Sequence, residues 1–421
     1  MSDYSEQLAA LRKRIAPIDD KYAVNRGNAT PVTPKADYTP ARIFVEELLS
    51  GEVVETEHGQ HFETEKLYER HRRHGSMGIS DLEDMAPDLL HCISEGEVPK
   101  SSCERWAFLD TETTGLAGGT GTYPFLIGVG RIAADGFRVR QFFMRDYAEE
   151  ASQLTALEEH LKQFDVLITY NGKTYDQPLL ETRYRMVRKK PPFARLQHLD
   201  LLYGARRLWR LRYDSCRLVD LENQVLGVER QGDLPGALIP YVYFEYLHTK
   251  QAHRLVPIFH HNATDILTLA CLTGIVPRAF QDPCAAEYSH GSEMVGIARW
   301  LLRSERHDDA AALMRRAVER GLRDELLFRT MWDLALIEKK KGRDHAALAI
   351  WTDLTASPNA FRVGAFEELS KFYEHKERNF AMALDMVESA MTNGETPDLR
   401  RRHERIAARL ARPKTKRLAL G

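Results

Sequence analysis

The sequence predicts an α/β domain over residues 101–283, built as a mixed sheet flanked by helices, and an all-helical region over residues 284–421. Two observations predict the sheet: a β-hairpin pattern near residue 130, and helical and strand patterns that alternate after it. A weak repeat of helical segments predicts the second region. Before them we expect an N-terminal helix and linker over residues 1–40, and a small extension over residues 41–100 that packs on the α/β domain.

The overall composition fits a globular protein and says little about its ligands. The 421 residues are 43% hydrophobic and 29% charged, and the net charge of −2 shows no global preference for nucleic acid. Five cysteines without a C-x-x-C pair favour neither a zinc knuckle nor a disulfide framework. The first residues are too charged for a signal peptide, and no apolar run approaches the ~18 residues that cross a bilayer. We therefore expect a cytoplasmic protein that does not bind membranes.

The elements of the α/β part follow from their apolar periods. Residues 53–68 alternate around a His-Gly turn, and residues 123–144 form two alternating runs joined by Ala-Asp-Gly, so each stretch predicts a hairpin. Short apolar runs predict further strands at 106–110, 165–172 and 194–202. Apolar residues at helical spacing predict helices over 152–164, 176–189 and 260–276.

The all-helical region is weakly repetitive. Three stretches starting at residues 306, 342 and 377 align by eye, with Ala310, Ala346 and Ala381 in the same place. Their spacings of 36 and 35 residues are near the 34-residue tetratricopeptide (TPR) period. We predict TPR-like helical hairpins, since the full TPR consensus is not evident. Arrays of this kind usually bind other proteins, so a protein partner is expected here. The tail after residue 399 is basic.

A pair of carboxylates ends the first strand of the α/β domain. Asp110 and Glu112 are two residues apart, so in a strand they point to the same side. Two carboxylates held together repel one another unless a cation lies between them. Hard oxygen ligands suit Mg²⁺ or Mn²⁺. The pair alone is equally compatible with a solvated strand end, so the surrounding motifs decide its interpretation.

Those motifs resemble the DEDD 3′–5′ exonucleases, a superfamily with the ribonuclease H-like fold. FLDTETTGL, around Asp110 and Glu112, resembles its first motif. TYNGKTYDQPLL supplies the Asn and Asp of the second at Asn171 and Asp176, and HHNATDILTL supplies the third at Asp265. LAGGTGTYPFLIGVG, SCRLVDLENQVLG and DLPGALIP further resemble the YprB-type ribonuclease H-like family, some members of which carry C-terminal TPR-like repeats.

The resemblance implies hydrolysis of phosphodiester bonds in nucleic acid by two divalent ions, Mg²⁺ or Mn²⁺. It implies that Asp110 bridges both ions, that Glu112 and Asp265 bind the ion that activates water, and that Asp176 acts on the other. Asn171 would orient the second-motif turn or the substrate.

The general base is open between two neighbouring histidines. His260 has the superfamily's spacing from Asp265. His261 is an i, i+4 neighbour of Asp265 on one helical face, and it fits the His-Asn-x-x-Asp pattern of the YprB-type family. A histidine with a pKa near 6.5 can accept a proton at neutral pH. Helical geometry favours His261 and superfamily spacing favours His260, and the resemblance to the YprB-type pattern gives a slight preference to His261.

Further residues are substrate-binding candidates. Gly118, Gly119 and Thr120 lie in a Gly/Thr loop after the first motif, where backbone N–H groups can approach a phosphate. Thr111 lies between the two carboxylates and joins them as a candidate. Asp200, at a predicted strand end, is either an outer-shell carboxylate or a helix N-cap.

Three functions remain open on these residues. The first is a metal-dependent 3′–5′ exonuclease acting on DNA or RNA, and the second is a structure-specific endonuclease of the same fold. The third is a non-catalytic nucleic-acid-binding scaffold that acts through its helical repeats. The intact carboxylate set argues against the third.

Overall fold

The computed structural model describes residues 42–115 and 120–411. The predicted N-terminal helix and linker, and Gly118 and Gly119, lie outside these ranges. The described chain forms two compact units: residues up to 206 with 215–281, and residues 207–214 with those from 282 onward.

The first unit is built on a seven-stranded mixed sheet with the order β1-β2-β7-β6-β5-β8-β9. The strands from β1 to β5 in this order pair antiparallel, whereas β5, β8 and β9 pair parallel. The strands are β1 (Glu52–Thr56), β2 (Gly59–Glu69), β5 (Trp106–Thr113), β6 (Pro124–Ala133), β7 (Gly136–Phe143), β8 (Val166–Thr169) and β9 (Gln197–Asp200). Both predicted hairpins are present, as β1–β2 and β6–β7. A separate two-stranded sheet pairs β3 (Arg73–His74) with β4 (Met77–Gly78).

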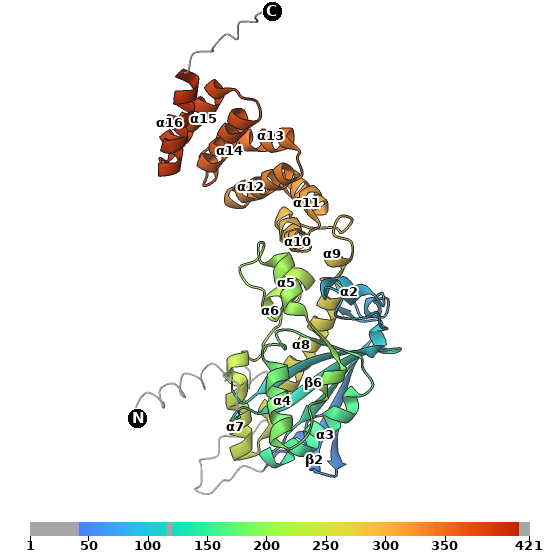
Figure 1. Cartoon of the computed structure of the whole chain (residues 1–421). Coiled ribbons are helices and arrows are strands. Elements are labelled where there is room, and N and C mark those ends of the chain that lie inside the picture. The colour runs from blue at the N-terminus through green and yellow to red at the C-terminus, as the bar shows by residue number, and fades with distance from the viewer. Residues whose placement is uncertain (1–41, 116–119, 412–421) are drawn as a thin grey trace, which may run out of the picture. The chain divides into compact units, whose positions relative to one another are not determined.

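Helices cover both faces of the large sheet (Figure 1). Leucines of α3 and α4 pack with Leu109, Ile127 and Phe142 on one face, and α8 lies against β5, β6 and β7 on the other. The helices of this unit are α2 (Leu89–Ile93), α3 (Glu150–Leu161), α4 (Asp176–Met186), α5 (Leu201–Trp209, of which residues 207–209 fall in the second unit), α6 (Leu218–Leu221), a π-helical turn η6 (Glu222–Leu226), α7 (Ile239–Thr249), α8 (Val256–Thr273) and α9 (Arg278–Gln281).

One helical run passes the length and composition test for a membrane span. Ala252–Gln281, which contains α8, has a mean hydropathy of 1.3 over an 18-residue window, and 78% of that window is buried inside the fold. The expectation that no apolar run approaches this length was therefore wrong. The run is apolar because it is the core helix of the sheet, and buried core helices pass the same test.

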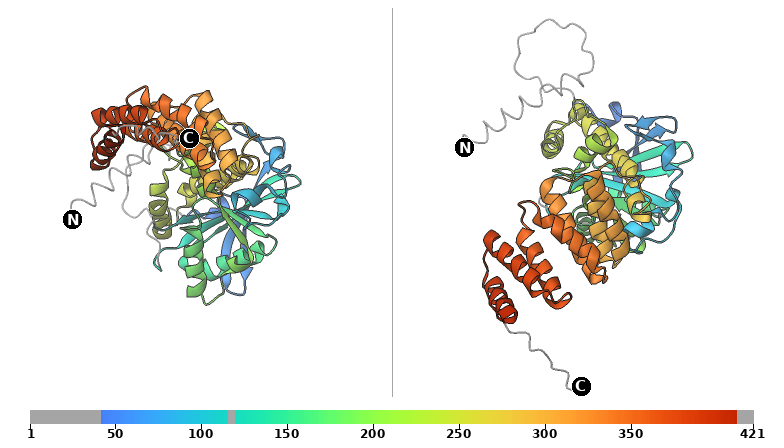
Figure 2. Two further views of the ribbon diagram at one scale, coloured as in Figure 1. Left: turned by 45° about the horizontal axis from the view of Figure 1, so that its top comes forward. Right: turned by 90° about the horizontal axis from the view of Figure 1, so that it is seen from above.

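The second unit consists of helices that stack one after another (Figure 2). They are α10 (Gly291–Arg303), α11 (His307–Arg320), α12 (Asp324–Lys340), α13 (Asp344–Thr355), α14 (Arg362–His375), α15 (Phe380–Asn393) and α16 (Pro397–Ala411). This is the predicted all-helical region.

The alanine alignment within this unit needs a correction. Ala310 is buried, but Ala346 is only half-buried and Ala381 is exposed. The fully buried alanines of α11, α13 and α15 include Ala311, Ala347 and Ala383, which are 36 residues apart each time. The helical repeat therefore has a period of 36 residues in these three helices. The equivalent alanines lie one or two positions after those that the sequence alignment matched.

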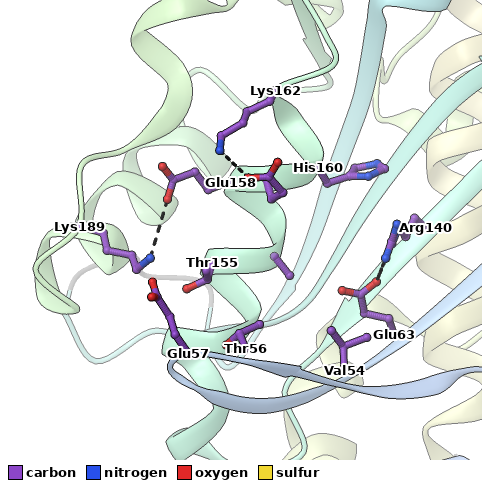
Figure 3. Close-up of a pocket in the computed structure, with 12 residues that line it drawn as sticks. Val54, Thr56, Glu57, Glu63, Arg140, Thr155, Glu158, His160, Lys162 and Lys189 are labelled. Carbon is purple, nitrogen blue, oxygen red and sulfur yellow. Dashed lines mark hydrogen bonds and ion pairs between the residues drawn. The ribbon is translucent and has the colours of Figure 1, made fainter.

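A surface pocket of about 560 Å³ lies between α3 and the β1, β2 and β7 edge of the sheet (Figure 3). Three ion pairs join charged side chains of its lining: Glu63 with Arg140, Glu158 with Lys189, and Glu159 with Lys162. None of the carboxylates of the three motifs lines it. The pocket is therefore separate from the carboxylates that the sequence motifs single out.

His160, which lines this pocket, is expected to make the stability of the fold decrease at acidic pH. The ring is buried beside Phe142 and Phe164. Burial, with the positive charge of Arg140, lowers the pKa of His160 to about 4. The unfolded chain then binds the proton more tightly, so stability is complete above pH ~6.5 and falls as the pH drops towards 4, at ~1.4 kcal/mol per pH unit.

The measurement is the free energy of unfolding at pH 7.5 and pH 5. We expect His160→Phe to lose ~2 kcal/mol less than the wild type between these two values, because the variant has no buried ring to protonate. Equal losses in the two proteins would show that His160 does not carry the effect.

Candidate active site

Strand β5 presents Asp110 and Glu112 on the face that α8 covers. Asp110 accepts a hydrogen bond from Asn262 Nδ2 on α8, at 2.9 Å. Burial, followed by the charges of Asp265 and Asp176, raises the pKa of Asp110 well above its ordinary value. Burial and then the charge of Asp110 do the same to the pKa of Glu112. Ionising Asp110 or Glu112 is therefore unfavourable while the neighbouring carboxylates are ionised.

Two glycines in β6 let α8 approach the sheet at this point. Gly128 is opposite Asp110 in the β5–β6 pairing. A Cβ atom at Gly128 would lie 2.3 Å from Asn262 Oδ1 and 2.3 Å from Ile266 Cδ1, and one at Gly130 would lie 2.5 Å from Ile266 Cγ2. Glycine is therefore required at position 128 of the IGVG segment, because any side chain there would occupy the space through which Asn262 reaches Asp110.

Asp176, the first residue of α4, comes to the site from the other face of the sheet. Thr111 alternates away from its two neighbours in β5, and its hydroxyl donates to Asp176 Oδ1 at 2.5 Å. Burial raises the pKa of Asp176 to about 6, although this hydrogen bond opposes the shift. Thr111 was predicted to bind substrate, but in this structure its hydroxyl is engaged by Asp176.

Asp200 shapes the turn between β8 and α4. Its buried carboxylate accepts from the backbone N–H groups of Asn171 at 2.8 Å and Lys173 at 3.1 Å. It also accepts from the N–H of Leu202, two residues on, in the manner of an N-cap. Asn171 is exposed and has a positive φ of 70° in this turn. Asp200 thus holds the backbone turn that leads to Asp176.

Asp265, on α8, has a cation and an imidazole as neighbours. Its Oδ1 accepts from an Arg230 terminal nitrogen at 2.5 Å, and its Oδ2 lies 3.6 Å from His261 Nε2. His261 Nδ1 in turn lies 2.9 Å from both carboxylate oxygens of Asp233. Burial by itself lowers the pKa of His261, but the hydrogen bond with Asp233 and the charge of Asp265 outweigh burial and raise it.

His260 has a different environment from its neighbour. It is exposed, and its Nδ1 lies 3.2 Å from Nζ of Lys66 on β2. Burial of part of the ring and the charge of Lys66 lower the pKa of His260. Of the two histidines, His261 is therefore the one in contact with a motif carboxylate.

The chemistry of this donor set fits hard divalent cations. The charges of Asp176 and Asp265 raise the cost of ionising Asp110 and Glu112, and a cation beside this pair would reduce that cost. As they stand, however, no three His, Cys, Asp or Glu side chains in the described residues lie close enough together to enclose an ion. Asp265 is turned to Arg230 and Asp176 to Thr111, so both have other partners.

Comparison with known proteins agrees with this fold. A model of the RNase_H superfamily matches residues 107–276, which span β5 to α8. The chain is also 32% identical over 358 residues to the "Uncharacterized protein YprB" of Bacillus subtilis (strain 168), which covers 83% of this chain and 84% of that protein. The chain belongs to the YprB-type family of ribonuclease H-like proteins. Ribonuclease H-like proteins generally use divalent metal ions, and the superfamily suggests nuclease activity.

The Gly/Thr loop of this YprB-type chain is described only in part. Thr120 is exposed, and its carbonyl oxygen accepts from Arg183 at 2.6 Å. Gly118 and Gly119 lie outside the described residues. Substrate binding by the three residues stays a prediction.

Sequence reasoning assigned no role to Arg230, Asp233 or Asn262. Asp233 lies in the YprB-type segment DLPGALIP, Asn262 lies in the third-motif segment HHNATDILTL, and Arg230 lies just before the first of these. A charged residue beside a Gly-Pro-rich turn was the available signal. It was too general to use, because such turns are usually solvated.

Proposed function

We propose that the protein is a metal-dependent nuclease that hydrolyses phosphodiester bonds of DNA or RNA from a 3′ end. The observation that carries the proposal is that Asp110 and Glu112 lie within electrostatic reach of Asp176 and Asp265, beside an imidazole nitrogen that faces Asp265. Buried groups with strongly shifted pKa values and a shared location are typical of functional sites.

Each residue has a role in this proposal. Asp110, Glu112, Asp265 and Asp176 would hold two Mg²⁺ or Mn²⁺ ions. When bound, these ions would supply the positive charge that stabilises the phosphorane-like transition state and the leaving oxygen. His261 would accept the proton of the attacking water through Nε2, which is the nitrogen on the side of Asp265.

The test uses the full chain with Mn²⁺ and 5′-labelled single strands of DNA and of RNA. Ladders that shorten from the 3′ end, and that vanish with EDTA, are expected. Cutting of a closed circle would indicate the endonuclease alternative. Unchanged substrates under all metal conditions, with binding intact, would leave the non-catalytic scaffold as the explanation. A protein partner of the helical unit and a cytoplasmic location stay predictions.

Because α8 approaches β6 closely, we expect the activity to be sensitive to substitution of Gly128. Gly128→Ala is expected to lower kcat by at least ~10-fold, because the added Cβ pushes Asn262 away from Asp110. Gly130→Ala is the matched control: its Cβ also meets Ile266, but no polar group of the site. Both variants should lose similar stability through overpacking. Equal activities in the two would contradict the role of Asn262.

A further inference from the structure

We propose that Asp233 is the positioning residue of His261, fixing the ring tautomer that leaves Nε2 free to accept a proton, and that Arg230 fixes Asp233. The inference rests on the proposed nuclease function, in which His261 Nε2 accepts the proton of the attacking water. It adds to the motif residues a loop, between η6 and α7, that carries both Arg230 and Asp233.

The first step is the hydrogen bond itself. Both oxygens of Asp233 lie 2.9 Å from His261 Nδ1. An ionised carboxylate only accepts, so Nδ1 must carry the proton. In a neutral imidazole the other nitrogen is then an acceptor. That nitrogen, Nε2, lies 3.6 Å from Asp265 Oδ2, so the accepting side of the ring faces Asp265.

The second step is the anchorage of Asp233. An Arg230 terminal nitrogen donates to Asp233 Oδ2 at 3.2 Å, while the other terminal nitrogen donates to Asp265 at 2.5 Å. The same guanidinium therefore touches both carboxylates that flank His261. Its Nε donates at 2.5 Å to Glu222, which is fully buried.

Glu222 is held in its turn by the core. It accepts from Thr268 Oγ1 at 2.6 Å and lies 3.0 Å from His74 Nε2. Arg230 is consequently a fixed group rather than a flexible side chain at the rim. Since planar guanidinium groups hold carboxylates in a defined geometry, Asp233 has one preferred position.

The neighbouring histidine has the opposite arrangement. Lys66 Nζ can only donate, and it lies 3.2 Å from His260 Nδ1. Neutral His260 therefore accepts at Nδ1 and carries its proton on Nε2. Two adjacent histidines in one helix are thus held in opposite tautomers, and only His261 has an accepting Nε2 towards Asp265.

This difference supplies an experiment that needs no substrate. Long-range ¹H–¹⁵N correlation spectra of the histidine-labelled full chain distinguish the two tautomers, provided that the pH is raised until the ring ¹⁵N shifts no longer change and both rings are neutral. The signals are assigned with His260→Gln and His261→Gln. We expect the Nδ1–H form for His261 and the Nε2–H form for His260 in the wild type.

Asp233→Ala should shift His261 towards the Nε2–H form and leave His260 unchanged. The same variant should lose ~10–100-fold in kcat with KM unchanged, and Asp233→Glu should regain part of it. Glu229→Ala is the matched control, since Glu229 is an exposed acid of the same loop. It should change neither the tautomers nor kcat.

The outcomes separate the two proposals. A wild-type His261 in the Nε2–H form, or one that keeps the Nδ1–H form in Asp233→Ala, overturns the positioning role. If the tautomers respond as expected while no substrate is cut under any metal condition, Asp233 positions His261 and the proposed nuclease function fails. A lower Tm in Asp233→Ala with unchanged tautomers would indicate a purely structural residue.

Discussion

Asp110→Asn is expected to abolish nuclease activity and, in the absence of metal, to make the protein more stable. The substitution removes a ligand that the proposed mechanism uses for both ions, so we expect a loss of at least ~10³-fold in kcat. It also removes one negative charge from a half-buried group whose pKa is raised by burial and by Asp265 and Asp176. Relief of that cost should add at least ~1 kcal/mol to the free energy of unfolding at neutral pH.

The measurement is thermal unfolding in EDTA and again in Mg²⁺, beside the activity assay. In EDTA the variant should unfold at a higher temperature than the wild type. Mg²⁺ should raise the Tm of the wild type more than that of the variant, because the variant has lost a ligand. Activity and unfolding temperature are independent measurements. A stabilised variant with full activity would refute the proposed mechanism, but it would still support the explanation that the Asp110 charge destabilises the fold.

The matched control is Asp135→Asn, in the exposed turn between β6 and β7. Its charge change is the same, but Arg138 lowers the pKa of Asp135 through a hydrogen bond, so the ionised form is favoured there. Asp135→Asn should therefore bring no stabilisation. If both variants gained the same stability in EDTA, net charge alone would be responsible.

The sequence predicted the sheet region well because its signals are local. The β1–β2 and β6–β7 hairpins follow from alternation and from turns with Gly59 and Gly136, both at positive φ. The common side of Asp110 and Glu112 follows from the strand period alone. For His261 and Asp265, the i, i+4 spacing predicted a contact that is present at 3.6 Å.

What the sequence could not predict depends on distant partners. Thr111 gave no sign that its hydroxyl would reach Asp176, 65 residues later. Glu222, in a π-helical turn, is held by Thr268, 46 residues later, and by His74 from a two-residue strand. Periodicity describes one element at a time, whereas these contacts exist only after β-strands, loops and α8 have come together.

Arg230→Met is expected to have the largest effect on stability. It leaves three carboxylates without their guanidinium: Glu222, which is fully buried, together with Asp233 and Asp265. Breaking a buried pair by removal of one partner costs ~3–5 kcal/mol, because an uncompensated charge remains in the interior. For a unit of this size the loss corresponds to a Tm lower by at least ~6 °C.

A double variant distinguishes this explanation from simple loss of packing. Arg230→Met with Glu222→Gln leaves no charge at the fully buried position, and Gln can still accept from Thr268. The double variant should therefore recover a substantial part of the lost stability, so that the two substitutions are not additive. Arg138→Met, at a partly exposed pair with Glu65 and Asp135, should cost only ~0–1 kcal/mol.

The effect of Mg²⁺ on the Tm of Arg230→Met further tests whether uncompensated charge causes the loss of stability. In Arg230→Met the facing carboxylates of Asp233 and Asp265 lack a cation, and a divalent ion near Asp265 would compensate part of that charge. The Tm of Arg230→Met should thus rise more with Mg²⁺ than the Tm of the wild type. A variant as stable as the wild type in EDTA would show that the Arg230 network does not hold the site together, and Asp233 would then need another anchor.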